Sequence, residues 1–523
     1  MSMGMSQLAE LLAGQGLAWA FGITGSGSSI DLIAGLEARG VRYYPACHEA
    51  AAAIMAGAAC KVSGQLAASI SIKGPGIANM LPGIAVNAFE NAPALSISEA
   101  YGSNVPAFKM HKRLDHAAIL SSVVKARATL DGIGEALPEL IAASRAEAPG
   151  PVHLDLCDSG RAWKAPVSRA EKPDPRSDKR ALKLISEARR PAVIAGSLAL
   201  RRGWGSMLER VEVPVFYTAA AKGVIDDGLT HCAGIYTGDG KSLAPESVII
   251  GKSDLVLGLG LRNTEILSSK AFGRPTVIVD DIVDDFADQE RLSAGMSPDV
   301  LVAGAGDAFV TTLLEAVSVK SWGSEATRDT IIGVRAELLN GKWLPAACFD
   351  ELNKLEYDHA LVTDTGAFCT IAEHLWKAGG SRPYISSGNG RYMGTSIPMA
   401  VGTSIARPGT PVFCAAGEGG VSMYPSEIKL AIDEKLPICF LFMSDGRYGS
   451  VGGAPGSAPS RNAVTIRRPS WWKAVEAMGC ESFRANSIAE FAGHIDSWMR
   501  QRPLFIESIF DPAPYAAMTA GLR

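Results

Sequence analysis

Two acidic residues, Glu418 and Asp445, each stand beside glycine and directly after a run of apolar residues. The first lies in Gly417-Glu418-Gly419-Gly420 and the second in Ser444-Asp445-Gly446. Glycines let backbone N–H groups approach a diphosphate, and carboxylates beside them supply the hard oxygen ligands that Mg²⁺ prefers. The two motifs therefore predict a site for a diphosphate and its divalent cation.

The elements around these motifs must bring the two carboxylates together. Apolar runs over Pro411–Ala416 and Ile438–Met443 predict parallel strands, and YPSEIKLAID between them predicts a helix. In open parallel sheets, ligands bind at the carboxyl ends of strands near helix N-termini. The spacing of 27 residues (445 − 418) is one strand–loop–helix–strand repeat. Both acids are therefore expected on one rim of a sheet.

The composition favours a soluble α/β protein of about three domains, because the chain has 523 residues, 47% apolar residues and 55 glycines. A net charge of −4 without a basic patch argues against nucleic acid as a partner. The nine cysteines are scattered, with no C-x-x-C pair, which favours reduced thiols. No leader peptide and no run of 18 apolar residues is recognisable, so we expect a cytoplasmic protein without membrane contact.

Apolar runs alternate with helical segments in three groups, which predicts α/β architecture with three doubly wound parallel-sheet domains. The expected boundaries are 1–168, 180–335 and 345–523, and the charged, proline-rich stretch 169–179 is expected to be a linker. The expected strands are Leu17–Ile23, Leu66–Ile72, Ala94–Ser98 and Val152–Leu156, then PAVIAGS, PVFYTA, DLVLGLG and PTVIVDD, and finally HALVTDTG, PYISSGNG, TPVFCAAGEGG, LPICFLFMSD and PLFIESI.

The motif around Glu418 and Asp445 is similar to the diphosphate and metal motif of thiamine-diphosphate-dependent enzymes. Residues 45–98, with His-Glu and Gly-Pro-Gly, resemble the pyrimidine-binding domain of the branch that contains acetolactate synthase and benzoylformate decarboxylase. FGITGSG resembles the turn that opens this domain, and SGNGRYMGTSIPMAVG resembles the segment beneath the cofactor's bend. The resemblance covers nearly the whole chain, in the order pyrimidine-binding, central nucleotide-fold-like and diphosphate-binding domain. It implies thiamine diphosphate and Mg²⁺ as cofactors.

The resemblance also implies roles for single residues. Glu49 matches the glutamate that hydrogen-bonds the aminopyrimidine and supports general acid–base catalysis, although an acid at a helix start is also favoured by the helix dipole. Met393 matches the wedge that bends the cofactor, and the Arg391 carbonyl would accept from the 4′-amino group; a lone methionine often only fills a core. Further cofactor contacts are expected from Gly366, Ala367, Phe368, Gly417, Gly419, Gly420 and Tyr448, and metal ligands from Glu418, Asp445 and the Arg447 carbonyl.

The sequence departs from the family pattern at several positions. Glu418 and Asp445 replace the usual aspartate and asparagine, so the metal site is more acidic. The paired histidines of pyruvate-decarboxylase-type enzymes are absent, and His111, His116 and His231 are either substitutes for them or ordinary structural histidines.

Two residues of the first domain are candidates for substrate contact. Ser26 matches a substrate-contacting serine of benzoylformate decarboxylase, or is an ordinary turn serine. Lys73 precedes Gly-Pro-Gly, where a small polar residue is common. It either solvates a rim or attracts an anionic group of the substrate, such as a second carboxylate, sulfonate or phosphonate.

The resemblance implies a lyase that acts on a small-molecule 2-oxo acid, by decarboxylation or by carboligation through a shared enamine. The alternatives are an acetolactate-synthase-like transferase and a catalytically weak cofactor-binding homologue. In the family, the pyrimidine site of one subunit faces the diphosphate site of another, which implies a homodimer or homotetramer with active sites at the interface. Whether the central domain binds a nucleotide stays open.

Overall fold

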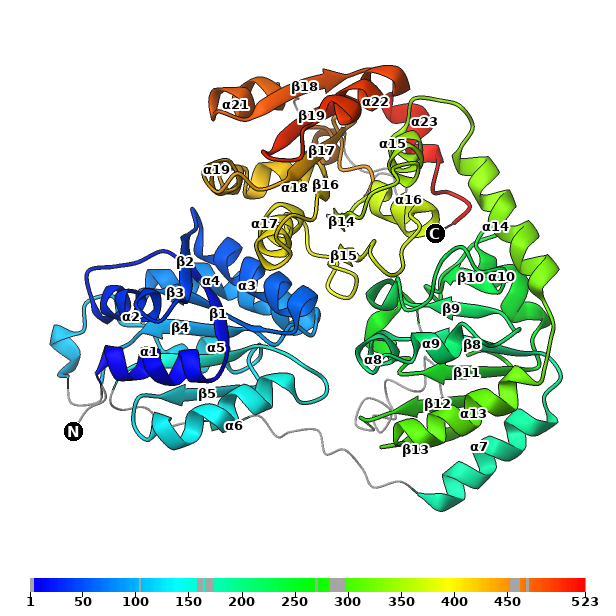
Figure 1. The fold of residues 1–523 in the computed structure, drawn as a ribbon, viewed down its shortest axis with the longest axis horizontal. Helices are drawn as coiled ribbons and strands as arrows, with labels where there is room; N and C mark the ends of the chain where they lie inside the picture. The colour runs from blue at the N-terminus through cyan, green and yellow to red at the C-terminus, as the bar shows by residue number, and fades with distance from the viewer. Residues whose placement is uncertain are drawn as a thin grey trace.

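The computed structural model describes residues 4–102, 105–157, 163–164, 174–268, 271–282, 298–451, 461–466 and 470–522. They form three α/β units, each built around its own sheet of six or seven strands (Figure 1). The predicted fold class, with three parallel sheets wrapped by helices, is confirmed. Within the described ranges, no helix has both the length and the apolar character needed to cross a membrane.

The first sheet has the strand order β2-β1-β3-β4-β6-β5-β7, and only the short edge strand β7 runs antiparallel to its neighbour. Its strands are β1 Leu17–Gly22, β2 Arg42–Pro45, β3 Leu66–Ser71, β4 Leu95–Glu99, β5 Ala126–Thr129, β6 Val152–Leu156 and β7 Trp163–Lys164. Its helices are α1 Met5–Gly14, α2 Ser28–Glu37, α3 Glu49–Ser63, α4 Pro75–Phe89, α5 His116–Leu120 and α6 Ile133–Arg145.

The second sheet has the parallel order β10-β9-β8-β11-β12-β13. Its strands are β8 Pro191–Ala195, β9 Val215–Tyr217, β10 Cys232–Ile235, β11 Leu255–Leu259, β12 Thr276–Asp280 and β13 Val300–Ala303. The helices of this part are α7 Pro175–Glu187, α8 Ser197–Arg201, α9 Gly205–Leu208, α10 Pro245–Ile249, α13 Asp307–Ser318 and α14 Ser324–Leu338. Helix α14 leads along the outside of the molecule toward the third unit (Figure 1).

The third sheet has the parallel order β15-β14-β16-β17-β19-β18. Its strands are β14 Ala360–Thr363, β15 Tyr384–Ser386, β16 Val412–Gly417, β17 Ile438–Ser444, β18 Glu481–Ala485 and β19 Leu504–Ile509. Its helices are α15 Pro345–Asn353, α16 Ala367–Leu375, α17 Ser396–Ala406, α18 Glu418–Met423, α19 Glu427–Asp433, α20 Arg461–Val464, α21 Trp471–Ala477, α22 Ile488–Ser497 and α23 Pro512–Ala517.

In each sheet the chain winds outward in opposite directions from one pair of adjacent strands, and ligand sites of doubly wound sheets lie at such points. The reversal falls between β1 and β3 in the first sheet, between β8 and β11 in the second and between β14 and β16 in the third. The loops that leave these strands are therefore the places to look for function.

The first and third units pack against each other through α3 and α17. Helix α3 is rich in alanine, and twelve of its residues are buried. A Cβ at Gly402 in α17 would overlap the backbone carbonyl of Met55 in α3, so the two helices touch backbone to backbone. Small residues thus fix the closest contact between the two terminal units.

The linker expected at 169–179 is wrong in its second half. Helix α7 begins at Pro175, with the Asp174 carboxylate accepting a hydrogen bond from the Arg176 backbone N–H. Asp followed by Pro is a favourable helix start, because the cap satisfies a free N–H and proline already has a helical φ. Residues 169–173 lie outside the described part of the chain.

The helix expected over YPSEIKLAID is shorter, and a second helix precedes it. Helix α18 begins at Glu418 itself, directly after the last residue of β16. Helix α19 then begins at Glu427. The glycine-rich motif is therefore a helix N-terminus rather than an open loop.

Candidate active site

The carboxyl ends of β14, β16 and β17 enclose a cavity of about 380 Å³. It lies at the point where the third sheet reverses its winding. The structure brings eleven of the residues expected at the cofactor into its lining: Gly366, Ala367, Phe368, Met393, Gly417, Glu418, Gly419, Gly420, Asp445, Arg447 and Tyr448. The lining also contains Thr365, Met443, Gly449, Ser450, Val451 and Tyr515.

Glycine is required at the start of α18. A Cβ at Gly419 would overlap the Met393 sulfur, and a Cβ at Gly420 would lie 2.6 Å from Asp364 Oδ2. The bare backbone of this first turn therefore reaches the cavity wall. Its N–H groups have no intrahelical acceptor, which makes such a helix start suitable for an anion such as a diphosphate.

Asp364 holds the segment that carries Met393. The carboxylate accepts hydrogen bonds from the Gly394 N–H at 2.9 and 3.0 Å and from the Ser396 hydroxyl at 3.0 Å. Burial raises the pKa of Asp364 to about 6, although these donors act in the opposite direction. Asp364 was not predicted as a functional residue, although it lies within the expected strand HALVTDTG.

Glu418 and Asp445 lie at the same cavity, and both are buried. Glu418 Oε1 accepts from the Ser444 hydroxyl at 2.8 Å and from the Gly446 N–H at 2.7 Å, and Asp445 Oδ1 accepts from the Arg447 N–H at 3.2 Å. Glu418 is therefore tied to the turn that carries Asp445. Two carboxylates at one wall suit a hard divalent cation.

Arg391 does not line this cavity. Its φ is 49°, a left-handed conformation that is uncommon outside glycine, and its guanidinium pairs with Glu373 Oε1 at 2.7 Å. This buried ion pair fixes the position of the segment Asn389–Met393. Glu373 was not predicted from the sequence, because nothing in its local pattern distinguishes it from other helical acids.

Glu49 is the first residue of α3 and is buried, with 8% of its surface exposed. Its Oε2 accepts a hydrogen bond from Asn79 Nδ2, in the first turns of α4, at 3.2 Å. The His48 imidazole caps α3 by accepting from the Ala50 N–H at 3.0 Å. Glu49 does not line the diphosphate-type cavity of its own chain.

The Ser26 and Lys73 loops follow β1 and β3, where the first sheet reverses its winding. Ser26 is exposed. The Lys73 ammonium pairs with Glu99 Oε2 at 2.9 Å, and Glu99 also accepts from the Ser29 hydroxyl at 2.7 Å. Burial opposes ionisation of Glu99, but the bonds from Ser29 and Lys73 prevail and lower its pKa.

The three candidate histidines occupy different settings. His111 is exposed, and His231 lies close to the Leu208 carbonyl of the central unit. His116 is buried, with Nδ1 2.6 Å from Asp155 Oδ1. His116, His153 and Asp155 form the one cluster in the described ranges whose ligand atoms are close enough for a metal ion. Because Asp155 also pairs with Arg127, its charge is already compensated by protein donors.

The reversal point of the central sheet is filled by a protein carboxylate. Glu265 accepts from the Ser197 N–H at 2.8 Å and from the Thr218 hydroxyl at 2.9 Å. Ser197 begins α8, directly after β8, where a nucleotide phosphate would bind in such a fold. The geometry thus favours a central unit without a bound nucleotide.

Three domains of one known protein family match this chain. The N-terminal thiamine pyrophosphate (thiamine diphosphate) binding domain of thiamine pyrophosphate enzymes matches residues 3–118, the central domain matches 179–312, and the C-terminal binding domain matches 364–508. The chain belongs to the thiamine pyrophosphate enzyme family.

Curated relatives of this thiamine pyrophosphate enzyme are distant but extend over most of the chain. A probable acetolactate synthase large subunit of Methanococcus aeolicus is 21% identical over 90% of this chain and 86% of its own. A probable 2-ketoarginine decarboxylase of Pseudomonas aeruginosa is 25% identical over 85% and 82%. An acetolactate synthase of Bacillus subtilis is 24% identical over 96% and 92%.

Proposed function

We propose that the protein is a thiamine-diphosphate-dependent lyase that acts on a small-molecule 2-oxo acid, by decarboxylation or carboligation. The observation that carries the proposal is the single cavity at which the bare start of α18, Met393, Glu418 and Asp445 meet. The names of the relatives, which include a decarboxylase of a 2-keto acid and acetolactate synthases, support the same substrate class.

The residues at this cavity fit the cofactor. Glycines at 417, 419 and 420 let this turn pack against Phe368, Met393 and Asp364, where any Cβ would come within 3.0 Å of those side chains. Their N–H groups carry no side chain beside them, which suits a closely held diphosphate. When bound, thiamine diphosphate supplies a nucleophilic carbon and an electron sink for the bond that breaks at the carbonyl. Met393 would support the bend of the cofactor, with the Arg391 carbonyl at the aminopyrimidine. Gly366, Ala367, Phe368 and Tyr448 would close the wall around it.

Glu418, Asp445 and the Arg447 carbonyl are the proposed ligands of Mg²⁺. All three residues line the cavity, and carboxylate and carbonyl oxygens are the donors that Mg²⁺ prefers. Glu418 is held in place by Ser444 and Gly446, which limits its freedom to rotate away.

Glu49 is the proposed catalytic acid–base residue. A buried carboxylate at a helix start can hold a proton at the aminopyrimidine and return it. Because Glu49 does not line the cavity of its own chain, we propose that it acts on the cofactor of a second subunit. A homodimer or homotetramer with sites at the interface follows. Ser26 and Lys73, in the loops at the reversal point of the first sheet, are the residues proposed to contact the substrate.

The domain limits 1–168, 180–335 and 345–523 and a cytoplasmic location are part of the proposal. All nine cysteines are free thiols and eight are buried, which supports a reducing compartment.

Two alternatives make different predictions. An acetolactate-synthase-like transferase would join two 2-oxo acids, as the names of several relatives suggest. A catalytically weak homologue would bind thiamine diphosphate without turnover, but a buried carboxylate at Glu49 would then have no task.

The test is incubation of the purified protein with thiamine diphosphate, Mg²⁺ and a panel of 2-oxo acids, with CO₂, aldehyde and hydroxyketone measured separately. A lyase releases CO₂ and aldehyde, or forms a hydroxyketone when an acceptor aldehyde is added. Formation of a 2-hydroxy-2-alkyl-3-oxo acid from two substrate molecules would favour the transferase. Absence of any product, with the cofactor bound, would refute the enzymatic proposal.

A further inference from the structure

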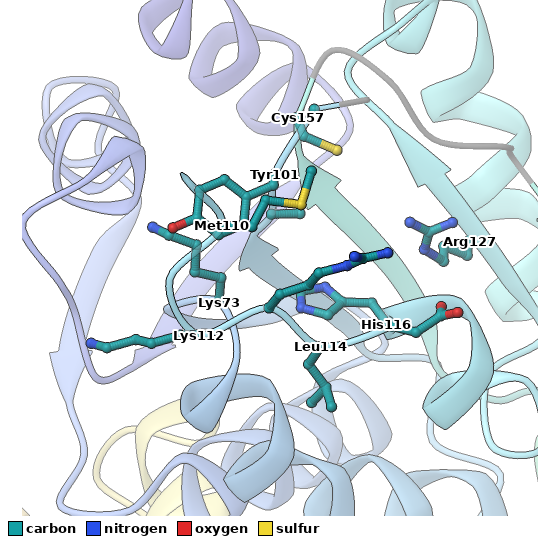
Figure 2. Close-up of a pocket in the computed structure, with 12 residues that line it drawn as sticks. Lys73, Tyr101, Met110, Lys112, Leu114, His116, Arg127 and Cys157 are labelled. Atoms are coloured by element: carbon teal, nitrogen blue, oxygen red, sulfur yellow. The ribbon is translucent and has the colours of Figure 1, made fainter. Parts of the chain in front are cut away.

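A second cavity, of about 220 Å³, lies at the carboxyl ends of β3, β4 and β6 in the first unit. Figure 2 shows His116 between Lys73 on one side and Arg127 on the other, with Tyr101 above them. The lining also includes Lys112 and Arg113. Five basic side chains thus surround a space smaller than the roughly 300 to 1,000 Å³ that drug-sized ligands need.

Most of this positive charge is already compensated, and two cations remain. Lys73 pairs with Glu99, and Arg127 pairs with Asp155, which also holds His116. Lys112 and Arg113 are exposed, and within the described ranges neither forms an ion pair.

The nearby carboxylate Asp115 does not cancel both cations. Its Oδ1 accepts from the Ala118 N–H at 3.0 Å and caps α5. The balance at the cavity is therefore positive, with two long side chains able to donate hydrogen bonds.

The cavity and Glu49 both lie beside the first turns of α4. Gly74, at the start of α4, has a φ of 68°, and a Cβ there would overlap the Lys112 carbonyl. The segment Met110–Asp115 therefore lies directly against the start of α4. Asn79, in the first turns of the same helix, donates to Glu49 at 3.2 Å. The start of α4 thus touches the proposed catalytic carboxylate and also a wall of the cavity.

We propose that this cavity binds an acidic group at the far end of the substrate, so that the preferred substrates are 2-oxo acids with a second carboxylate, sulfonate or phosphonate. Arg113 and Lys112 bind the acidic group, and the compensated pairs Lys73–Glu99 and Arg127–Asp155 form rigid walls. The inference rests on the proposed function, because it places the reacting carbonyl of the 2-oxo acid on the side of α4 that faces Glu49.

The kinetic test compares substrates that differ only in the distal group. 2-Oxoglutarate and 2-oxopentanoate have the same chain length, and 3-sulfopyruvate offers a second acidic tail. Wild-type kcat/KM should be higher for the acidic substrates. Arg113→Met should raise KM for them by about 10-fold or more with little change for 2-oxopentanoate, because only ground-state binding of the tail is lost. Arg113→Lys should recover much of this effect.

Lys109→Met is the matched control, since Lys109 is an exposed cation near the same segment that does not line the cavity. Equal KM changes for acidic and neutral substrates, or a wild-type preference for 2-oxopentanoate, would overturn the inference.

A direct binding measurement keeps the inference separate from the activity. Calorimetric titration with glutarate should show binding to the wild type and to Lys109→Met that is at least about 10-fold weaker in Arg113→Met, and pentanoate should bind poorly to all three. If no 2-oxo acid is turned over, the proposed function fails, and the glutarate titration still decides whether the cavity binds acids. Glutarate binding that is absent, or unchanged in Arg113→Met, would refute it.

Discussion

At the scale of single residues, a substitution of Glu49 should lower turnover without weakening cofactor binding. Glu49→Gln keeps the size of the side chain and an acceptor for Asn79, so the fold and the diphosphate anchoring should persist. Turnover should fall by about 10²-fold or more, the usual contribution of a general acid–base group. Steady-state kinetics checks this, with the exposed Glu37→Gln as control. A fully active Glu49→Gln enzyme would remove Glu49 from the mechanism.

The paired carboxylates Glu418 and Asp445 predict an unusual dependence on metal. Two negative side chains strengthen cation binding but repel a diphosphate when the cation is missing. Thiamine diphosphate should therefore bind much more weakly without Mg²⁺, and Asp445→Asn should keep cofactor binding while weakening metal affinity. Calorimetric titration with and without Mg²⁺ measures both. Tight binding that ignores the metal would mean that the two carboxylates do not share an ion.

Functional residues could be predicted from the sequence where their neighbours in the chain form a recognisable motif. Glycines around Glu418 and the motif around Met393 led to residues that the structure places at one cavity. Asp364, Glu99 and Glu373 could not be found in this way, because their partners stand up to 70 residues away and no local spacing connects them.

At the scale of elements, most interior strands were predictable and most edge strands were not; the edge strand β15, within PYISSGNG, was predicted, and the interior strand β5 was not. Strands β3, β8 and β17 are buried along their whole length and consist mostly of apolar residues, with serine as the only polar residue. Strands β2, β10, β13 and β18 lie at sheet edges, and β2 and β18 are partly exposed. Strands β2 (RYYP) and β18 (ESFRA) mix polar and apolar residues, and β10 (CAGI) and β13 (VLVA) are apolar runs of only four residues, so none of the four was predicted from the sequence.

Contact between α3 and α17 should be very sensitive to one methyl group. Gly402→Ala would place a Cβ into the Met55 carbonyl of α3, and because both atoms belong to backbones, neither can move away easily. We expect a loss of roughly 1 to 3 kcal/mol in stability. Gly333→Ala in α14, where a Cβ meets nothing within 4 Å, should instead be neutral or stabilising. Denaturant unfolding compares them, and equal effects would contradict the close packing.

The link between α19 and the turn before α3 should depend on pH. Glu427 is buried and accepts from the Cys47 N–H at 3.1 and 3.2 Å, and burial raises its pKa from 4.5 to about 7. Because the folded-state pKa is raised, the stabilisation is present below pH 4.5 and is lost as the pH rises through 7.

Glu427→Gln cannot titrate, so its stability relative to the wild type should increase between about pH 5 and 8. Denaturation midpoints across this range provide the measurement, and Glu476→Gln at an exposed position of α21 serves as control. A difference between wild type and Glu427→Gln that does not change with pH would exclude a raised pKa.

At the scale of the whole molecule, the proposed active site requires residues from two chains. Glu49 and the cavity around Glu418 do not meet within one chain. In the proposed two-fold assembly, each Glu49 would act at the cavity of the partner, and two equivalent sites would result. Light scattering should accordingly give at least a dimer.

Complementation between two inactive variants tests this most directly. Glu49→Gln and Glu418→Ala proteins are each purified, mixed, dissociated and reassembled with thiamine diphosphate and Mg²⁺, and CO₂ release from a 2-oxo acid is measured. Half of the dimers should be mixed, and one of their two sites should combine an intact Glu49 with an intact Glu418. We expect recovery of up to about a quarter of the wild-type activity. No recovery in mixed dimers, or an active monomer, would contradict a site built from Glu49 of one subunit and the cavity of another.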